Sequence, residues 1–442
     1  MALSGLDIYK LLPKTNCREC GFATCLAFAM QLAKKAAKVE KCPHLSAQAK
    51  VTLEASSLPP IRLVAVGASE GKFEAGNETV LFRHEEKFHH PCGLGFIVED
   101  SLSLEAIKEK LKQINHLKLE RIGQELNVNL IALKQSSGKD AFLKSLKLIM
   151  DNTKLALVLI SDDLDSLRDA LEICRERNPL VYHVTKENIE EVSKLAQEFK
   201  VPLVVSAADL EGLSDLTARL AEKGIQDLFL DTGRKSISDK IWDLTQARRQ
   251  ALKKSNRSLG YPFLVIVDNT DPYAEAVEAA TYISKYAGIV LIKGTESWAA
   301  LSLLTLRQNI YTDPQKPLQI EPKVYAIGKA GSESPVLVTT NFSLSYYTVL
   351  SEVEASKIGA HIISVDTEGM SVLTAWAAEK FTAAKIAQSL SKFNLCDIVA
   401  HKKLIIPGYV AIISGDLADE SGWQVIVGPK EAAGIPSFLK NL

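Results

Sequence analysis

Short apolar runs alternate with amphipathic stretches through the middle of the chain. Between residues 93 and 325, eight β-rich runs each precede a polar turn and a helical pattern: GFIVED, NVNLIAL, LALVLIS, PLVYHVT, PLVVSA, DLFLDT, FLVIVDNT and GIVLIKG. Apolar strands that alternate with helices are typical of a parallel sheet covered on both faces, and eight such units are typical of a closed barrel. We therefore predict a central (β/α)8 TIM barrel over residues 93–325.

The last part of the chain, residues 326–442, repeats this alternation with four strand-like runs: SPVLVTT, GAHIISVD, KKLIIPG and WQVIVGP. Helical patterns lie between them, and one predicts a helix over residues 374–390. Together they predict a doubly wound, Rossmann-like α/β domain, in which a ligand binds outside the carboxyl ends of the strands. The loop DTEGMS has one glycine and does not match G-x-G-x-x-G, which disfavours a dinucleotide.

Two segments precede the barrel. Residues 1–57 predict a small domain in which Thr15 or Asn16 caps a turn and one apolar helix face follows, formed by Leu26, Phe28, Ala29, Leu32, Ala33 and Ala36. Residues 58–92 open with two prolines and predict a linker with two extended segments, RLVAVG and TVLFRH, on either side of a Gly-Asn turn. The whole chain is thus expected to be a multidomain α/β protein.

Charge and targeting signals narrow the class of protein. Lys and Arg number 52 against 53 Asp and Glu, so no excess of one sign favours nucleic acid or a membrane surface. The amino terminus lacks a signal-peptide pattern, and no run of 18 apolar residues follows. We therefore expect a cytoplasmic protein without nucleic-acid or membrane partners, in which cysteine thiols stay reduced and available to metal.

Four cysteines near the amino terminus are the strongest chemical signal. Cys17, Cys20, Cys25 and Cys42 follow the pattern C-x2-C-x4-C-x16-C, and Pro43 comes directly after the last. Four thiolates at this spacing favour a [4Fe-4S] cluster. An all-cysteine zinc site and a set of reduced structural thiols are the alternatives.

Polar residues also follow several of the predicted barrel strands. Asp231, Asp268 and Asn269 stand at strand ends, where the active sites of such barrels lie, and could form a pocket for a small molecule. The alternative is that these residues only cap the helices that follow.

The three parts together resemble one family, the large (gamma) subunit of the corrinoid iron-sulfur protein of the reductive acetyl-CoA (Wood-Ljungdahl) pathway. The resemblance runs from CRECGFATCLAFAMQLAKKAAKVEKCP through the eight barrel units to TTNFSLSYYT and VDTEGMSVLTAW. It implies a methyl carrier that takes part in methyltransferase reactions. The cobalt of a corrinoid accepts a methyl group from methyltetrahydrofolate through a methyltransferase and passes it to acetyl-CoA synthase.

The resemblance also implies cofactors and partners. A [4Fe-4S] cluster on the four cysteines reduces inactive Co(II) to Co(I), with electrons from a donor such as ferredoxin. A separate small subunit completes a heterodimer. The histidine motif D-x-H-x-x-G is absent, and only His361 and His401 lie in the last domain. This absence fits a corrinoid bound base-off, without a nitrogen ligand from the protein.

By the same resemblance, the corrinoid is held by loops of the last domain. Thr374 is expected beneath the ring, and its alternative role is that of a helix cap. The full set of implied corrinoid residues is Thr339, Thr340, Asn341, Tyr346, Gly369, Met370, Ser371, Val372, Leu373, Thr374, Pro407, Gly408, Gly434 and Pro436.

Two other functions remain open from the residues alone. A folate-dependent barrel methyltransferase with an accessory cluster would use the strand-end pocket for a pterin. An electron-transfer adaptor would have the cluster and no corrinoid.

Overall fold

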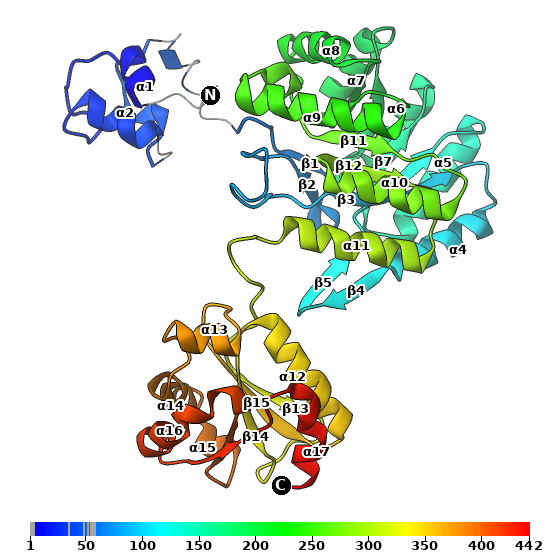
Figure 1. Ribbon diagram of the computed structural model, residues 1–442. Coiled ribbons are helices and arrows are strands. Elements are labelled where there is room, and N and C mark those ends of the chain that lie inside the picture. Colours follow the sequence, from blue (N-terminus) through cyan, green and yellow to red (C-terminus); the bar gives the residue numbers. More distant parts are fainter. Residues whose placement is uncertain (1–4, 34–35, 47–48, 51–52, 54–58) are drawn as a thin grey trace. The chain divides into compact units, whose positions relative to one another are not determined.

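The computed structural model describes residues 5–33, 36–46, 49–50, 53 and 59–442 (Figure 1). The chain divides into two compact units, residues 1–119 with 126–311, and residues 120–125 with 312–442. None of the helices in the described ranges is long and apolar enough to cross a membrane.

The first unit contains a closed barrel of eight parallel strands, which confirms the central prediction. Each predicted run overlaps one of them: β3 (Gly93–Glu99), β6 (Leu130–Lys134), β7 (Ala156–Ile160), β8 (Leu180–Val184), β9 (Leu203–Ser206), β10 (Leu228–Asp231), β11 (Phe263–Ile266) and β12 (Ala287–Ile292). Pairing of β12 with β3 closes the ring.

Eight helices follow these strands and surround the barrel (Figure 1). Several begin at side chains that accept a hydrogen bond from the first turn, such as Asp209 before α8 and Ser236 before α9. The helices are α4 (Leu104–Asn115), α5 (Lys139–Asn152), α6 (Leu164–Cys174), α7 (Ile189–Phe199), α8 (Leu210–Glu222), α9 (Ile237–Lys253), α10 (Pro272–Ser284) and α11 (Ser297–Tyr311).

A hairpin of β1 (Val64–Val66) and β2 (Phe73–Ala75) fills the amino-terminal end of the barrel. Its four apolar side chains join the inner barrel cluster, and the Phe73 ring lies against Gly93 at the start of β3. The prediction that TVLFRH is extended is therefore wrong, because the second strand lies before the Gly-Asn pair. The backbone N–H groups of Leu81 and Phe82 donate instead to the Glu85 carboxylate.

A second hairpin, which the pattern did not predict, joins α4 to β6. It consists of β4 (Lys118–Arg121) and β5 (Gln124–Asn127). Short 3-10 turns complete the chain: η1 (Val39–Lys41), η2 (Ser69–Gly71), η3 (Arg175–Arg177), η4 (Arg257–Leu259), η5 (Gly408–Ile413) and η6 (Ala432–Gly434).

The second unit is built on a five-stranded sheet in the order β13-β15-β14-β16-β17, in which only β13 is antiparallel. This open sheet confirms the predicted class of the carboxyl-terminal domain. The strands are β13 (Val324–Ile327), β14 (Val336–Thr340), β15 (Ala360–Val365), β16 (Lys403–Ile406) and β17 (Gln424–Val427).

Helices cover both faces of this sheet. One apolar layer lies under α12 (Ser343–Ser356) and α17 (Ile435–Lys440). The other lies under α13 (Val372–Ala377), α14 (Ala383–Lys392), α15 (Leu395–Ile398) and α16 (Ser414–Ser421). The predicted single helix over 374–390 is wrong, because Glu379 has a positive φ of 56° and Thr382 caps a new helix.

The amino-terminal segment contains α1 (Gly5–Leu11) and α2 (Cys25–Ala33). Phe28 and Ala29 of α2 are buried together with Cys25, Cys42 and Ile8. The predicted apolar helix face is thus present only in part, because Leu32 is half-buried and Leu26 and Ala33 are exposed. Residues 34 and 35, at its predicted continuation, lie outside the described residues.

Candidate cofactor sites

The four amino-terminal cysteines lie around the start of α2. Cys25 is its first residue, and the Cys25 backbone N–H donates to Asn16 Oδ1 at 2.8 Å, as the cap prediction expected. Cys25 and Cys42 are buried, Cys20 is half-buried and Cys17 is exposed. The loop between the first two cysteines and the helix turns through Gly21, whose φ is 83°.

The other three amino-terminal cysteines act electrostatically on the Cys42 thiol. Burial raises the pKa of the Cys42 thiol, and a hydrogen bond from the His44 backbone lowers it. The thiols of Cys20, Cys25 and Cys17 raise this pKa further, because neighbouring thiolates repel one another. Four thiolates that share one cofactor repel one another and need positive charge between them, so this set of four cysteines fits an iron-sulfur cluster by the chemistry of its donors.

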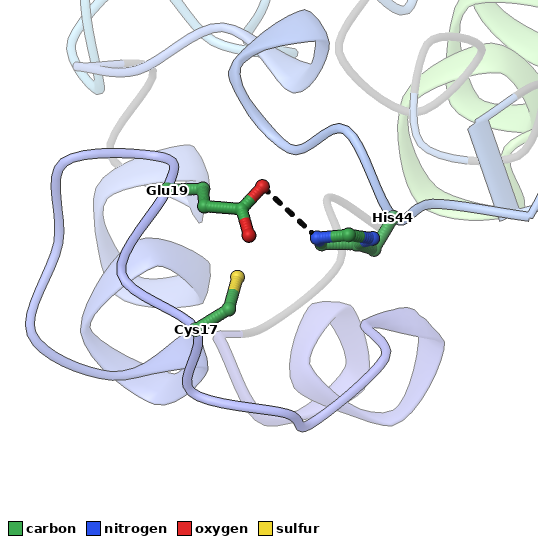
Figure 2. Close-up of side chains that lie close together, drawn as sticks. All are labelled: Cys17, Glu19 and His44. Atoms are coloured by element: carbon green, nitrogen blue, oxygen red, sulfur yellow. Dashed lines mark hydrogen bonds and ion pairs between the residues drawn. The ribbon is translucent and has the colours of Figure 1, made fainter.

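Cys17 also lies beside two exposed polar side chains (Figure 2). The ligand atoms of Cys17, Glu19 and His44 are within 4.8 Å of one another, and His44 Nε2 is 3.0 Å from Glu19 Oε2. This is the one group of that kind that the described residues contain. The Glu19–His44 pair brackets the exposed ligand and gives this edge of the site a polar surface.

In the second unit, Asn341 joins the loops that follow β14 and β15. Its Oδ1 accepts hydrogen bonds from the backbone N–H groups of Thr367 and Gly369, at 2.9 and 3.0 Å. Its Nδ2 donates to Gln319 Oε1 and Asp366 Oδ1, at 3.1 and 3.3 Å. The side chain is only 1% exposed, so this buried amide fixes the loop over 366–369.

Four buried hydroxyls at the carboxyl end of this sheet have no hydrogen-bond partner in the described structure. Thr339 pairs in register with Ser364, so both side chains point to the α12 face of the sheet. The set is Thr339, Ser343 and Ser364, together with Thr340, whose side chain points to the opposite face of the sheet. A buried hydroxyl without a partner costs about 1–3 kcal/mol, which is recovered when a ligand supplies the missing group. These oxygens therefore indicate a site for a polar ligand.

Exposed apolar side chains surround the same end of the sheet. Each follows one of the four parallel strands or stands at its last residue, although large apolar side chains are normally buried. They are Leu344, Leu373, Trp376, Tyr409, Ile412 and Val427, with exposed fractions from 40% to 76%. Buried hydrogen-bonding groups inside an apolar rim fit a broad ligand that carries polar side groups.

The predicted corrinoid residues fall in several environments. Thr339, Thr340 and Asn341 are buried at the end of β14. The Gly408 N–H donates to the Pro429 carbonyl at 3.0 Å, which joins the loop that starts at Pro407 to the one after β17. Gly434 ends η6, and Pro436 lies in the first turn of α17.

The loop before α13 contains the other predicted residues. Gly369 has a φ of 76°, and a Cβ there would lie 2.6 Å from Gln319 Cγ. Met370, Ser371 and Val372 are half-buried, and Leu373 and Thr374 are exposed.

The structure places Thr374 and Tyr346 differently from the sequence-based expectation. Ser371 takes the N-cap position of α13, and Thr374 lies one turn further with its Oγ1 2.9 Å from Ser371 Oγ. The cap alternative for Thr374 is thus wrong in position. Tyr346 is 4% exposed, and the centroids of its ring and the Tyr325 ring are 4.7 Å apart, so Tyr346 is part of the core beneath α12.

The barrel has a polar cavity of about 340 Å³ at the carboxyl ends of its strands. Asp231 accepts from Lys240 Nζ at 2.8 Å and from the Tyr182 hydroxyl at 2.9 Å. Burial and the Asp231 carboxylate raise the pKa of Tyr182, so this hydroxyl stays protonated. A hydrogen bond from Lys293 lowers the pKa of Asp268. The two aspartates are not caps, and their charges are already matched within the barrel.

Sequence reasoning named the cysteines and the end of β14 as candidate site residues, and it did not name Ser343 or Ser364. Ser364 stands inside an apolar run, where it reads as a core position. Its only signal is the strand register, which places it beside Thr339.

The fold and its two sites define a multidomain α/β protein with a cysteine centre and a ligand-binding sheet edge in separate parts of the chain. The family model described as CO dehydrogenase/acetyl-CoA synthase delta subunit matches residues 63–439. A second model, described as "Putative Fe-S cluster", matches residues 12–44.

Two curated relatives match over the full length. The corrinoid/iron-sulfur protein large subunit of Moorella thermoacetica is 44% identical over 100% of this chain and 99% of its own. The acetyl-CoA decarbonylase/synthase complex subunit gamma of Methanothermobacter thermautotrophicus is 33% identical over the same shares. The chain belongs to the family formed by these large and gamma subunits, which confirms the resemblance.

Among solved structures, Yersinia pestis dihydropteroate synthase matches 50% of this chain and 93% of its own, with 11% identity and a TM-score of 0.38. A likeness this weak carries no information on function.

Proposed function

We propose that the chain is the methyl carrier of the acetyl-CoA pathway. It would hold a corrinoid at the carboxyl edge of its five-stranded sheet and a [4Fe-4S] cluster on Cys17, Cys20, Cys25 and Cys42. When bound, the corrinoid supplies a cobalt centre that accepts and gives up methyl groups, and the cluster supplies single electrons.

The observation that carries this proposal is the sheet edge itself. The unpartnered hydroxyls of Thr339, Thr340, Ser343 and Ser364 would donate to the amide side groups of the ligand. The apolar rim would contact the broad ring and exclude water. Asn341 would hold the loop over 366–369 in place beneath it.

The histidines support a corrinoid without a nitrogen ligand from this chain. His361 Nε2 lies 3.1 Å from the Gly331 carbonyl, and His401 Nε2 lies 3.0 Å from the Ser334 carbonyl. Both partners come just before β14, at the amino-terminal end of the sheet. Neither ring lies at the carboxyl edge.

The burial of the cysteines supports an electron-transfer role. Cys25 and Cys42 lie in an apolar core that would keep water from one side of a cluster. Cys17 is exposed, which would leave a path for electrons from a soluble donor such as ferredoxin.

The partners follow from the family. The Moorella relative is named as a large subunit, so we propose that this chain pairs with a small subunit. The methyltetrahydrofolate methyltransferase and acetyl-CoA synthase would then be transient partners, and the cytoplasm the compartment in which they meet.

Methyl transfer and corrinoid binding test the proposal together. We expect Ile412→Glu to weaken corrinoid binding at least tenfold in an absorbance titration, since Ile412 is 76% exposed on the rim. Ile398→Glu is the matched control, because Ile398 is 36% exposed on α15, before β16 begins. The corrinoid-loaded protein should accept one labelled methyl group from methyltetrahydrofolate when the methyltransferase is added. Equal corrinoid binding by both variants, or no labelled product, would contradict the proposal.

A further inference from the structure

The outer surfaces of α10 and α11 carry no exposed charge. Their 13 and 15 residues include three charged side chains. Glu275 and Arg307 are buried, and the half-buried Glu278 accepts a hydrogen bond from Tyr282. A helix on the surface of a water-soluble domain normally has charged residues on its outer side. These two helices therefore have the surface of an element that another protein covers.

The large side chains that face outward on α10 and α11 are apolar. Tyr273 and Val277 of α10 are 69% and 65% exposed, and Trp298 of α11 is 44% exposed. Helices α10 and α11 lie side by side (Figure 1), and the Tyr273 and Trp298 rings stack across them with their centroids 4.8 Å apart. We call these three residues, with Thr281 and Ser302, the α10–α11 face.

Even the hydroxyls on the α10–α11 face are satisfied internally. Thr281 Oγ1 donates to the Val277 carbonyl at 2.8 Å, and Ser302 Oγ donates to the Trp298 carbonyl at 2.7 Å. Because both donors are bonded to their own helices, the face loses little hydration when it is covered.

The helices on the opposite half of the barrel have charged outer surfaces. Helices α5, α6, α7 and α8 have at least four charged residues each, and none of their large apolar side chains is exposed. Ion pairs link several of these helices, such as Arg168 to Glu198 and Arg219 to Glu190. The contrast within one barrel shows that the α10–α11 face is not a general property of its helices.

The exposed aromatic area of this face supplies part of what one partner contributes to a stable interface. Aromatic side chains present roughly 200 Å² each when fully exposed, so Tyr273 and Trp298 together expose about 230 Å², and Trp242 on α9 exposes about 130 Å². Ile237 on α9, Val277 on α10, Leu104 on α4 and Leu102 before α4 add to this on neighbouring elements. A standard interface buries about 800 Å² per partner, and the largest apolar patch on a typical monomer is about 300–600 Å².

We propose that the α10–α11 face is the docking surface for the small subunit. The proposal rests on the proposed function for the existence of that subunit. Permanent interfaces are apolar and depleted of charge at their centres, with Trp and Tyr as anchors, whereas partners that come and go bind more polar surfaces. The uncharged face therefore suits the permanent partner and not the methyltransferase, the synthase or the electron donor. The partner should present an apolar, uncharged surface in return.

Photo-crosslinking in the full-length complex identifies the occupant. A benzoylphenylalanine at position 277 should crosslink to the small subunit, while the same group at exposed Glu191 on α7 should not. A crosslink from position 277 to a second copy of this chain, or to another part of the same chain, would overturn the proposal.

Affinity gives an independent test. The double variant Tyr273→Glu, Val277→Arg should bind the small subunit at least tenfold more weakly in isothermal titration, and Glu191→Arg should bind as the wild type does. Circular dichroism checks that the double variant is folded; Trp298→Ala, which adds no charge, is the second variant and should also weaken binding. If the wild type binds and all variants bind equally, the docking inference alone is wrong. If the wild type does not bind, the heterodimer of the proposed function is wrong as well.

Discussion

Replacing Thr339 by valine should stabilise the chain and weaken corrinoid binding at the same time. Thr339 is 1% exposed, and its Oγ1 is a buried hydroxyl without a partner. Valine has almost the same shape and removes this oxygen. An unpaired buried hydroxyl costs about 1–3 kcal/mol, so we expect the free energy of unfolding of the ligand-free protein to rise by about 1 kcal/mol. Most core substitutions lower it.

When corrinoid is bound, the same substitution should be unfavourable. The wild-type hydroxyl would then donate to the ligand, and one such hydrogen bond contributes about 0.5–1.5 kcal/mol. Loss of this bond should weaken corrinoid binding roughly two- to tenfold. The opposite effects on the two states separate a ligand contact from a packing defect, which would weaken both.

Two measurements decide the matter, with Thr217→Val as the control. Hydrogen exchange of the β14 amides reports the stability of the ligand-free domain, and isothermal titration reports corrinoid affinity. Thr217 is equally buried, but its Oγ1 donates to the Ser214 and Ser258 carbonyls at 3.0 and 2.7 Å. Its valine variant should be less stable, measured by exchange of the α8 amides, and bind corrinoid normally. A Thr339→Val protein that is destabilised, or that binds corrinoid as tightly as the wild type, would refute the reasoning.

Four further outcomes are expected. Cys42→Ala should lose the cluster absorbance and reductive reactivation while circular dichroism shows that the rest of the chain stays folded; unchanged reactivation would contradict the assigned ligand. Thr374→His should shift the Co(II)/Co(I) potential in spectroelectrochemistry and slow reactivation, with Thr374→Ser near wild type, and an unmoved potential with corrinoid bound would rule out a place beneath the cobalt. Lys240→Met should lower the free energy of unfolding, measured in urea, by about 3 kcal/mol, because it leaves the buried Asp231 carboxylate without its cation. Adding Asp231→Asn to this variant should restore most of the lost free energy. If Lys240→Met lowers the free energy of unfolding by less than about 1 kcal/mol, the ion pair is not buried in solution. Burial raises the pKa of Cys92 to about 12, so its thiol should stay protonated at pH 8 and resist iodoacetamide until the chain unfolds, whereas exposed Cys396 should react; peptide mass spectrometry showing alkylation of Cys92 in the folded protein would disprove this.

The barrel was predictable because its strands are buried on both faces and therefore appear as continuous apolar runs. The same rule failed for TVLFRH, where apolar residues are held in an irregular turn by the Glu85 carboxylate. The β4–β5 hairpin was missed because KLERIGQELN is largely polar. The break after α13 was missed because Phe381, which is fully buried, is drawn into the core by tertiary packing that a helical pattern does not record.

Of the two candidate sites, one could be predicted from the sequence and the other could not. Cysteine spacing is local, so the candidate metal ligands were found from the sequence. The sheet-edge site depends on which strands are neighbours, and only the pairing of Thr339 with Ser364 brings their hydroxyls together. The exposed rim was also invisible, since a pattern of apolar residues does not distinguish Ile412 on the surface from a residue of the core.

The bonds of Asn341 have a consequence for repeated turnover. One side chain makes hydrogen bonds to two separate segments, Gln319 and the loop over 366–369, before any ligand is present. A loop that is ordered in advance loses no further conformational entropy when its ligand arrives. The floor of the site can therefore keep one shape while successive partners approach and leave the opposite side of the ligand. Aspartate in this position would keep the two bonds that hold the loop, but it would lose the donor to Gln319 and set a second carboxylate against Asp366, so the segment around Gln319 would no longer be tied to the floor.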